Sequence, residues 1–247
     1  MKAYSLYVFD LDGTIYRGRE VVPHAGSVVT ELLRRGSSVR FFTNNSAARP
    51  SQVSAILNHM GVPCKSEWVF GTGQLAAKHC LESDFKDVFV VGEEALKQTL
   101  SDQGLVVLGL RPEAVVVGIC RTFTYELLDQ ASTFVRNGVP FIATNEDATY
   151  PLEKGRLQPG AGSIVAAVRV ASGVEPLILG KPQPHLATLA MDSAQVVAAE
   201  TLVVGDRMDT DIACGKNANC DTFLVLTGVE HQLPHGQQGG ADLRGLL

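Results

Sequence analysis

The sequence has few features that would suit it to zinc, to a membrane or to nucleic acid. Its five cysteines among 247 residues are odd in number and scattered, and no two have the C-x-x-C spacing of a zinc or dithiol redox site. No apolar run approaches the ~18 to 20 residues that cross a bilayer. The formal net charge of −5 is unfavourable for binding nucleic acid or anionic membranes. Small molecules are therefore the partners that we expect.

The amino terminus also lacks room for an export signal. The first four residues lead directly into an apolar run, which leaves no space for a charged segment followed by a hydrophobic one. Scattered cysteines without a pairing pattern suit a reducing compartment. We therefore expect a cytoplasmic protein, and the sequence leaves a homodimer open.

The composition and the order of segments indicate the fold class. Hydrophobic residues make up 45% of the chain and charged residues 19%, as in globular proteins. Strand-like and helix-like segments alternate, which indicates an α/β architecture with a largely parallel sheet. The expected strands are 6–9, 39–42, 202–204 and 223–226, and the expected helices are 26–35, 49–60 and about 209–217.

Two carboxylates follow the first expected strand. Asp10 and Asp12 are two residues apart, so in an extended segment they point the same way, and Gly13 allows a sharp bend behind them. Burying two carboxylates is costly unless a cation or hydrogen bonds compensate. The pattern therefore suits a divalent-metal site with one spare carboxylate. Taken alone, it is also compatible with an ordinary acidic turn.

Three further polar clusters each follow an apolar run. The first offers hydroxyl and amide groups to phosphate oxygens, the second is a lysine and the third is a group of acids. In chain order they are Thr43-Asn44-Asn45, Lys181, and the set Asp206, Asp209 and Asp211. Ligands collect at the carboxyl ends of strands in an open parallel sheet, so we expect these groups to meet at one edge.

Taken together, the four clusters resemble the four motifs of the haloacid dehalogenase (HAD) superfamily of phosphohydrolases. Their residue patterns are most similar to those of the NagD-like or para-nitrophenyl-phosphatase subgroup with a type IIA cap. The patterns are D-x-D-G-T, T-N-N-S, G-K-P and G-D-x-x-x-T-D. The resemblance runs from about residue 6 to residue 229, and four motifs in order are far more specific than any one. It implies a Rossmann-like HAD core with a parallel sheet plus an inserted α/β cap domain.

The middle of the chain fits that inserted cap. Residues 87–176 continue the α/β rhythm with their own expected strands at 88–91, 114–117 and 140–144, yet carry none of the four motifs. About 90 residues are enough for an independent domain. We therefore expect a catalytic core formed by 1–82 and 177–247, and a substrate-specificity cap formed by 83–176.

The resemblance implies roles for the acids. Asp10 would be the nucleophile that becomes an aspartyl phosphate, and it would also bind Mg²⁺. Asp12 would act as general acid and then general base, with its backbone carbonyl on the metal. Asp206 would be the second side-chain ligand, and Asp211 would orient metal-bound water or the lysine. Asp209 is the less favoured of that last pair.

The resemblance also implies roles for the groups that bind substrate. Thr43 and Asn44 would hold the transferring phosphoryl oxygens through the hydroxyl and backbone N–H groups, and Asn45 is expected to bind phosphate with them. Lys181 would neutralise both the nucleophile and the phosphate; an ordinary surface lysine is the alternative.

A loop of the cap, residues 143–151, resembles the family loop that reaches over the active site. Asn145 and Asp147 in it are expected to contact substrate, with turn formation as the alternative. Ala148 and Thr149 occupy the region where some family members have a histidine, which argues against a pyridoxal phosphate preference.

The sequence thus predicts a Mg²⁺-dependent phosphatase that hydrolyses small-molecule phosphate monoesters through an aspartyl phosphate. Sugar phosphates, phosphoglycolate, glycerol phosphate and nucleoside monophosphates all remain open as substrates. One alternative is a phosphoryl transferase or phosphomutase, in which a second alcohol takes the phosphoryl group. Another is a non-catalytic metabolite-binding protein, whose mark would be loss of Asp10, Asp12, Lys181 or Asp206; all four are present.

Two nucleotide-binding patterns are not favoured. The glycines of residues 71–76 loosely match a dinucleotide-binding turn, but no acid ends a clear strand about twenty residues further on. Gly180-Lys181 lacks the upstream glycine of a phosphate-binding loop.

Overall fold

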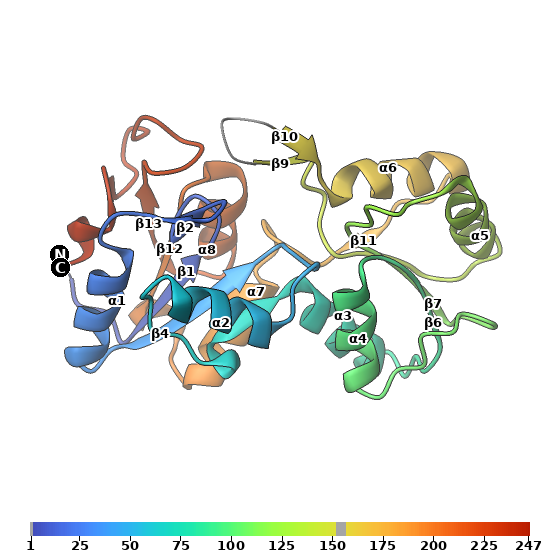
Figure 1. Cartoon of the computed structure of the whole chain (residues 1–247), viewed down its shortest axis with the longest axis horizontal. Coiled ribbons are helices and arrows are strands. Elements are labelled where there is room, and N and C mark those ends of the chain that lie inside the picture. Colours follow the sequence, from blue (N-terminus) through green and yellow to red (C-terminus); the bar gives the residue numbers. More distant parts are fainter. Residues whose placement is uncertain (1, 152–156) are drawn as a thin grey trace.

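The computed structural model describes residues 2–151 and 157–247, and these form two large sheets with helices packed around them, and two short two-stranded sheets. Figure 1 shows the two large sheets as neighbouring parts, with both chain termini in the same part. We call the part with the termini the core and the other part the cap.

The core is built on a parallel sheet. Within the described residues it has six strands in the order β14-β13-β12-β1-β4-β5, and every neighbouring pair is parallel. Its strands are β1 (Leu6–Asp10), β4 (Ser38–Thr43), β5 (Val69–Gly71), β12 (Thr201–Gly205), β13 (Asp221–Val225) and β14 (Gly239–Gly240). The strands expected from the sequence are confirmed, with bounds shifted by one or two residues.

Helices cover both faces of this sheet. The α-helices of the core are α1 (Ala25–Arg34), α2 (Pro50–His59), α3 (Thr72–Glu82), α7 (His185–Ala194) and α8 (Ala213–Asn217). Successive residues of β1 point to opposite faces, and both faces are apolar: Leu6 and Val8 belong to one buried cluster, Tyr7 and Phe9 to the other. A strand buried on both faces can present polar groups only at its end.

The cap has its own parallel sheet of four strands, in the order β11-β8-β7-β6 among the described residues. Its strands and helices are β6 (Val88–Val91), α4 (Glu94–Asp102), β7 (Ala114–Val117), α5 (Tyr125–Arg136), β8 (Phe141–Ala143), α6 (Ala161–Ser172) and β11 (Leu177–Ile178). A buried cluster that includes Leu75, Leu96 and Leu186 continues from the core into the cap, so the two parts share apolar contacts.

The short apolar run before Lys181, which the expected domain bounds assign to the core, forms a strand of the cap sheet. We expected residues 177–179 to join the core, but β11 pairs with β8 of the cap, with Ile178 opposite Ala143. Only two residues pair, and Leu177 is 45% exposed at the sheet edge, so the apolar run was too short to indicate which sheet it would join. The chain re-enters the core just after this strand, and Lys181 lies on that return.

Short elements complete the fold. The hairpin β2 (Tyr16–Arg17) and β3 (Glu20–Val21) follows the first carboxylates, and β9 (Thr149–Pro151) pairs with β10 (Leu157–Pro159) in the cap. The helix expected at about 209–217 begins as a π-helical turn, η4 (Met208–Ile212), before α8. The 3-10 helices are η1 (Ser66–Trp68), η3 (Ala198–Glu200) and η5 (Leu243–Leu246). No helix in the described part of the chain combines the length and apolar character that crossing a membrane requires.

Candidate active site

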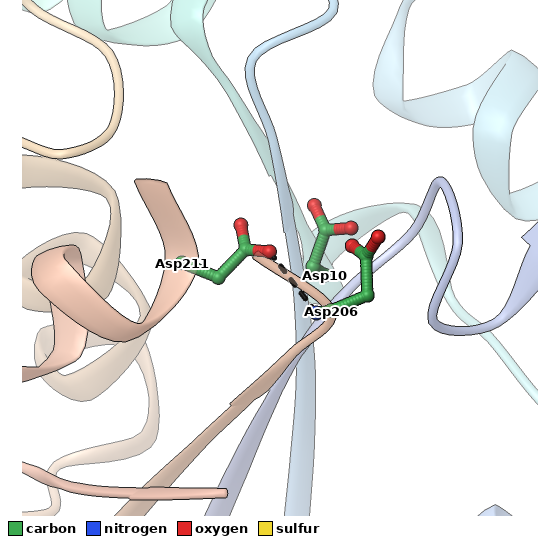
Figure 2. A group of neighbouring side chains, drawn as sticks. All are labelled: Asp10, Asp206 and Asp211. Atoms are coloured by element: carbon green, nitrogen blue, oxygen red, sulfur yellow. Dashed lines mark hydrogen bonds between the residues drawn. The ribbon is translucent and has the colours of Figure 1, made fainter. Parts of the chain in front are cut away.

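Three buried carboxylates meet at the carboxyl edge of the core sheet. Asp10 is the last residue of β1, and Asp206 follows β12, which lies beside β1 in parallel register. Asp211 comes from η4, and Figure 2 shows the three side chains gathered at the ends of the strands. One carboxylate oxygen from each lies within 4.8 Å of the others. The expected juxtaposition of the first and fourth motifs is thus present in the structure.

The surroundings of Asp206 fit a bound cation. Its Oδ2 accepts a hydrogen bond from the Val229 N–H at 2.7 Å, while its Oδ1 is buried and without a hydrogen-bond partner among the described residues. A buried carboxylate oxygen without a partner is costly, and a hard cation would compensate it. Gly13 has φ +88°, and a Cβ there would lie 2.4 Å from Asp206 Oδ2, so the D-x-D-G turn closes directly on this carboxylate. Asp10 and Asp206 are therefore fit to hold Mg²⁺.

Lys181 is a buried cation within the same group. Its Nζ donates to Asp10 Oδ1 and, at 2.6 Å, to Asp211 Oδ1. Burial opposes the charge, but the two carboxylates outweigh burial and raise the pKa of Lys181. The lysine is 5% exposed, so the surface-lysine alternative is wrong. It is a fixed positive charge directly beside the expected nucleophile.

Asp10 and Asp206 have raised pKa values. Burial, followed by repulsion from Asp211, raises the pKa of Asp10 well above its usual range, although Lys181 acts in the opposite direction. Burial and Asp211 also raise the pKa of Asp206 to about 7. Two neighbouring carboxylates whose pKa values are both raised lie where a bound cation would stabilise their ionised forms.

Asp211 and Asp209 occupy different environments. The Oδ2 of Asp211 accepts from the backbone N–H groups of Asp206 and Arg207 at 3.2 and 3.1 Å, and its Oδ1 accepts from Lys181. Asp209 instead pairs with the Arg207 guanidinium at 2.7 Å, and its side chain is 66% exposed. The π-helical turn points only Asp211 into the carboxylate group, consistent with the preference for Asp211.

Asp12 lies beside this group rather than in it. Burial raises its pKa to about 6, while Lys181 and the hydroxyl of Tyr16 act to lower it. The chain bends back here, since the Gly13 N–H donates to the Tyr16 carbonyl at 2.7 Å. A carboxyl group that titrates near neutral pH can both give and take a proton. Sequence reasoning missed Tyr16, whose only signal was its place in the turn behind the two acids.

The T-N-N segment divides into three different positions. Thr43 ends β4, next to the nucleophile's strand, and is buried with its hydroxyl accepting the Asn45 N–H at 3.1 Å. Asn45 is exposed, and its side-chain oxygen accepts from the Ala47 N–H at 2.8 Å. Asn44 is buried, and its side chain hydrogen-bonds Lys181 and Asp147. The three residues, which were expected to act together, thus lie in three different environments.

The two cap residues also differ from each other. Asn145 is buried and donates to the Asn44 carbonyl at 2.7 Å, so its amide is used within the protein. Asp147 is partly exposed, and burial raises its pKa while Lys181 and the Asn44 amide act to lower it. Arg207, which the sequence reasoning did not single out, also acts to lower the pKa of Asp147. The cap loop thus reaches the active site chiefly through Asp147.

Comparison with known proteins identifies the family. A model of haloacid dehalogenase-like hydrolases matches residues 7–106, and a second, HAD-hydrolase-like model matches residues 178–242. The chain is 42% identical over 231 residues to the 5′-nucleotidase YutF of Bacillus subtilis (strain 168), covering 93% of this chain and 90% of that protein. The chain belongs to the haloacid dehalogenase-like hydrolases.

Solved HAD structures share the whole arrangement. NagD from Escherichia coli K-12 superposes with a TM-score of 0.90 at 27% identity, covering 98% of each chain. A glycerol phosphate phosphatase, Rv1692 of Mycobacterium tuberculosis in complex with magnesium, gives a TM-score of 0.89 at 35% identity, covering 100% of this chain and 79% of that one. This HAD-like hydrolase therefore has the NagD-like form, a parallel Rossmann-like core with an α/β cap, and it is a phosphatase.

Proposed function

We propose that this HAD-like phosphatase hydrolyses phosphate monoesters of small metabolites through an aspartyl phosphate on Asp10, with Mg²⁺ as its cofactor. The observation that carries the proposal is the position of Asp10, which is hydrogen-bonded to the buried Lys181 ammonium and grouped with Asp206. A carboxylate can approach a dianionic phosphate only where positive charge compensates both partners.

Asp10, Asp206 and the Asp12 backbone carbonyl would hold the Mg²⁺. Oxygen ligands suit this ion, and the Asp206 oxygen without a partner among the described residues is the strongest indication of the site. When bound, the ion supplies charge neutralisation and polarises the transferring phosphoryl group. The similar glycerol phosphate phosphatase was crystallised in complex with magnesium, which supports this choice of metal.

In the first chemical step, an oxygen of Asp10 attacks phosphorus while the bond from phosphorus to the ester oxygen breaks. Protonated Asp12 gives its proton to the departing alkoxide, so the leaving group departs as an alcohol. The pKa of about 6 keeps part of the Asp12 population protonated near neutral pH. Lys181 and the Thr43 hydroxyl contact the phosphoryl oxygens.

In the second step, water attacks the phosphorus of the aspartyl phosphate. Asp12, now ionised, takes a proton from this water, and the Asp10 carboxylate leaves as inorganic phosphate forms. Asp211 keeps Lys181 in place through both steps, because it accepts a second hydrogen bond from the ammonium, at 2.6 Å.

The cap would select the substrate. We propose the division into a core of 1–82 and 177–247 and a cap of 83–176, with Asp147 as the cap residue that contacts the leaving group. A cap of this size admits only small substrates to the active site. The similar 5′-nucleotidase and glycerol phosphate phosphatase support small phosphomonoesters but point to different leaving groups.

The test is to assay the purified protein with Mg²⁺ against a panel of phosphomonoesters, and to quench the reaction early to detect phosphorylated protein. Hydrolysis together with a phosphoryl group on Asp10 is the expected result. Hydrolysis without phosphoprotein would reject the covalent mechanism, and no hydrolysis on the panel would reject the function. Adding sugar acceptors separates the transferase alternative, for which phosphate release would fall as phosphorylated acceptor appears.

A further inference from the structure

The side chain of Asn44 is used by the protein rather than left open to a substrate. Its Oδ1 accepts the Lys181 N–H at 2.8 Å, and its Nδ2 approaches the Lys181 carbonyl at 3.3 Å. The same Nδ2 donates to the Asp147 carboxylate, at 3.1 and 3.3 Å from its two oxygens. Asn44 is 6% exposed. The side-chain amide therefore has no capacity left for phosphoryl oxygens, which leaves only the backbone N–H of Asn44 for the role that the sequence predicted.

The backbone of Asn44 makes a second connection to the cap. Its carbonyl accepts from Asn145 Nδ2 at 2.7 Å and from the Thr72 hydroxyl at 2.9 Å. The Oδ1 of Asn145 accepts the Asp147 N–H at 3.1 Å, which fixes the turn that presents the Asp147 carboxylate. Asn44 from the core, and Asn145 and Asp147 from the cap, form one hydrogen-bonded unit that we call the positioning cluster.

The chain segment carrying Lys181 is held closely by this cluster. A Cβ at Gly180 would lie 2.5 Å from the Thr144 carbonyl oxygen and 2.6 Å from Asn44 Oδ1. The backbone just before Lys181 thus runs between the end of a cap strand and the Asn44 amide. Because the Lys181 ammonium must reach Asp10, a shift of this backbone would move the charge away from the nucleophile.

We infer that the positioning cluster of Asn44, Asn145 and Asp147 sets the position of the Lys181 backbone and couples it to the placement of the cap loop. The Asn44 side chain then positions Lys181 and is not itself a phosphate ligand. This inference rests on the proposed function, since it assigns Lys181 a part in the chemistry. It follows that a correctly seated cap loop is needed for a correctly placed lysine.

A reciprocal exchange tests the inference. In the double variant Asn44→Asp/Asp147→Asn, the carboxylate at 44 still accepts the Lys181 N–H, and the amide at 147 can donate to it. The hydrogen bond between the two side chains is restored in the opposite direction with no change in total charge. Asn44→Asp alone places two carboxylates face to face, and we expect kcat to fall about 10- to 100-fold.

The expected result is recovery of about tenfold or more in kcat when Asp147→Asn is added to Asn44→Asp, although each single variant is impaired. A phosphate ligand would behave differently, because a carboxylate at position 44 repels phosphate whatever stands at 147. The inference would be overturned if the losses in kcat of the two single variants simply multiplied in the double variant. It would also be overturned if the variants changed only KM and the inhibition constant for inorganic phosphate. Asn137→Asp, at the exposed end of α5, adds the same charge as a control and should leave kcat unchanged.

A second cycle avoids a buried charge, in case Asn44→Asp does not fold. Asn44→Ser and Asp147→Ala each remove one side of the hydrogen bond, so the loss in kcat from the serine should be smaller when Asp147 is already absent. Strict additivity in this cycle would also reject the cluster. Absence of turnover in the wild type rejects the proposed function before any variant is compared, whereas an active wild type with additive variants rejects only the inference.

Discussion

Lys181 donates a hydrogen bond of 2.6 Å to Asp211, and both side chains are buried. The contact places a second carboxylate on the lysine that already bonds Asp10, so the ammonium lies between the two acids. A buried ammonium with two fixed partners has little freedom to move, and its direction is set by both. The relationship gives Asp211 a function without requiring it to touch substrate.

The nucleophile gives the first prediction. Asp10→Asn should abolish turnover, because an amide is a poor nucleophile and a poor metal ligand. The fold should survive, with an unchanged or higher Tm, since the substitution removes one of three mutually repelling carboxylates. Steady-state assays and thermal unfolding measure both effects. Activity within about tenfold of the wild type would exclude Asp10 as the nucleophile.

Asp211 and Asp209 form a matched pair for the second prediction. Asp211→Asn weakens the hold on Lys181, and we expect kcat to fall about 10- to 100-fold. Asp209→Asn should leave kcat within about threefold of the wild type, because the Asp209 side chain is exposed and pairs with Arg207 rather than with Lys181. Equal losses in the two variants would contradict the placement of Asp211 in the site.

Metal removal gives the third prediction. EDTA should stop hydrolysis and Mg²⁺ should restore it, whereas Ca²⁺ should bind and inhibit because its larger, looser coordination shell misplaces Asp10 relative to phosphorus. Asp206→Ala should steeply raise the Mg²⁺ concentration needed for half-maximal activity. Full activity in EDTA, or a Mg²⁺ titration unchanged in the variant, would exclude the metal site as described.

The raised pKa of Asp12 gives a pH prediction. Asp12 must be protonated to give its proton to the leaving group, and with a pKa of about 6 the protonated fraction falls as the pH rises through that value. The kcat/KM for an alkyl phosphate should therefore decline above about pH 6, by about tenfold per pH unit. In Asp12→Asn this decline should disappear and kcat should be lower by ~10² to 10⁴-fold. A pH profile with the same decline in the variant would assign it to another group.

The sequence predicted the elements and the acids better than it predicted the partners of the polar side chains. The apolar runs before Asp10 and Asp206 are buried on both faces, so their strands and the edge where they meet follow from the pattern. The hydrogen bonds that join Asn44 to Lys181 and Asn145 to the Asn44 carbonyl could not be predicted, because these partners lie about 100 to 140 residues apart along the chain. A polar residue at a strand end indicates a site but not whether it faces ligand or protein.

The last prediction compares two glycines, Gly13 and Gly36, to distinguish the cost of a positive φ from the cost of a steric contact with Asp206. Gly13 and Gly36 have nearly the same positive φ, +88° and +85°, but a Cβ at Gly36 meets no atom of the described residues within 4 Å, whereas one at Gly13 meets the Asp206 carboxylate. Gly36→Ala should cost about 1 to 2 kcal/mol of unfolding free energy, the cost of the left-handed backbone alone, with activity retained. Gly13→Ala should cost more and should also raise the Mg²⁺ requirement, because Asp206 must move to make room for the methyl group. Denaturant unfolding and a Mg²⁺ titration of both variants measure these effects. If Gly13→Ala lost only as much stability as Gly36→Ala and kept the wild-type Mg²⁺ requirement, then contact with Gly13 would not be what positions Asp206.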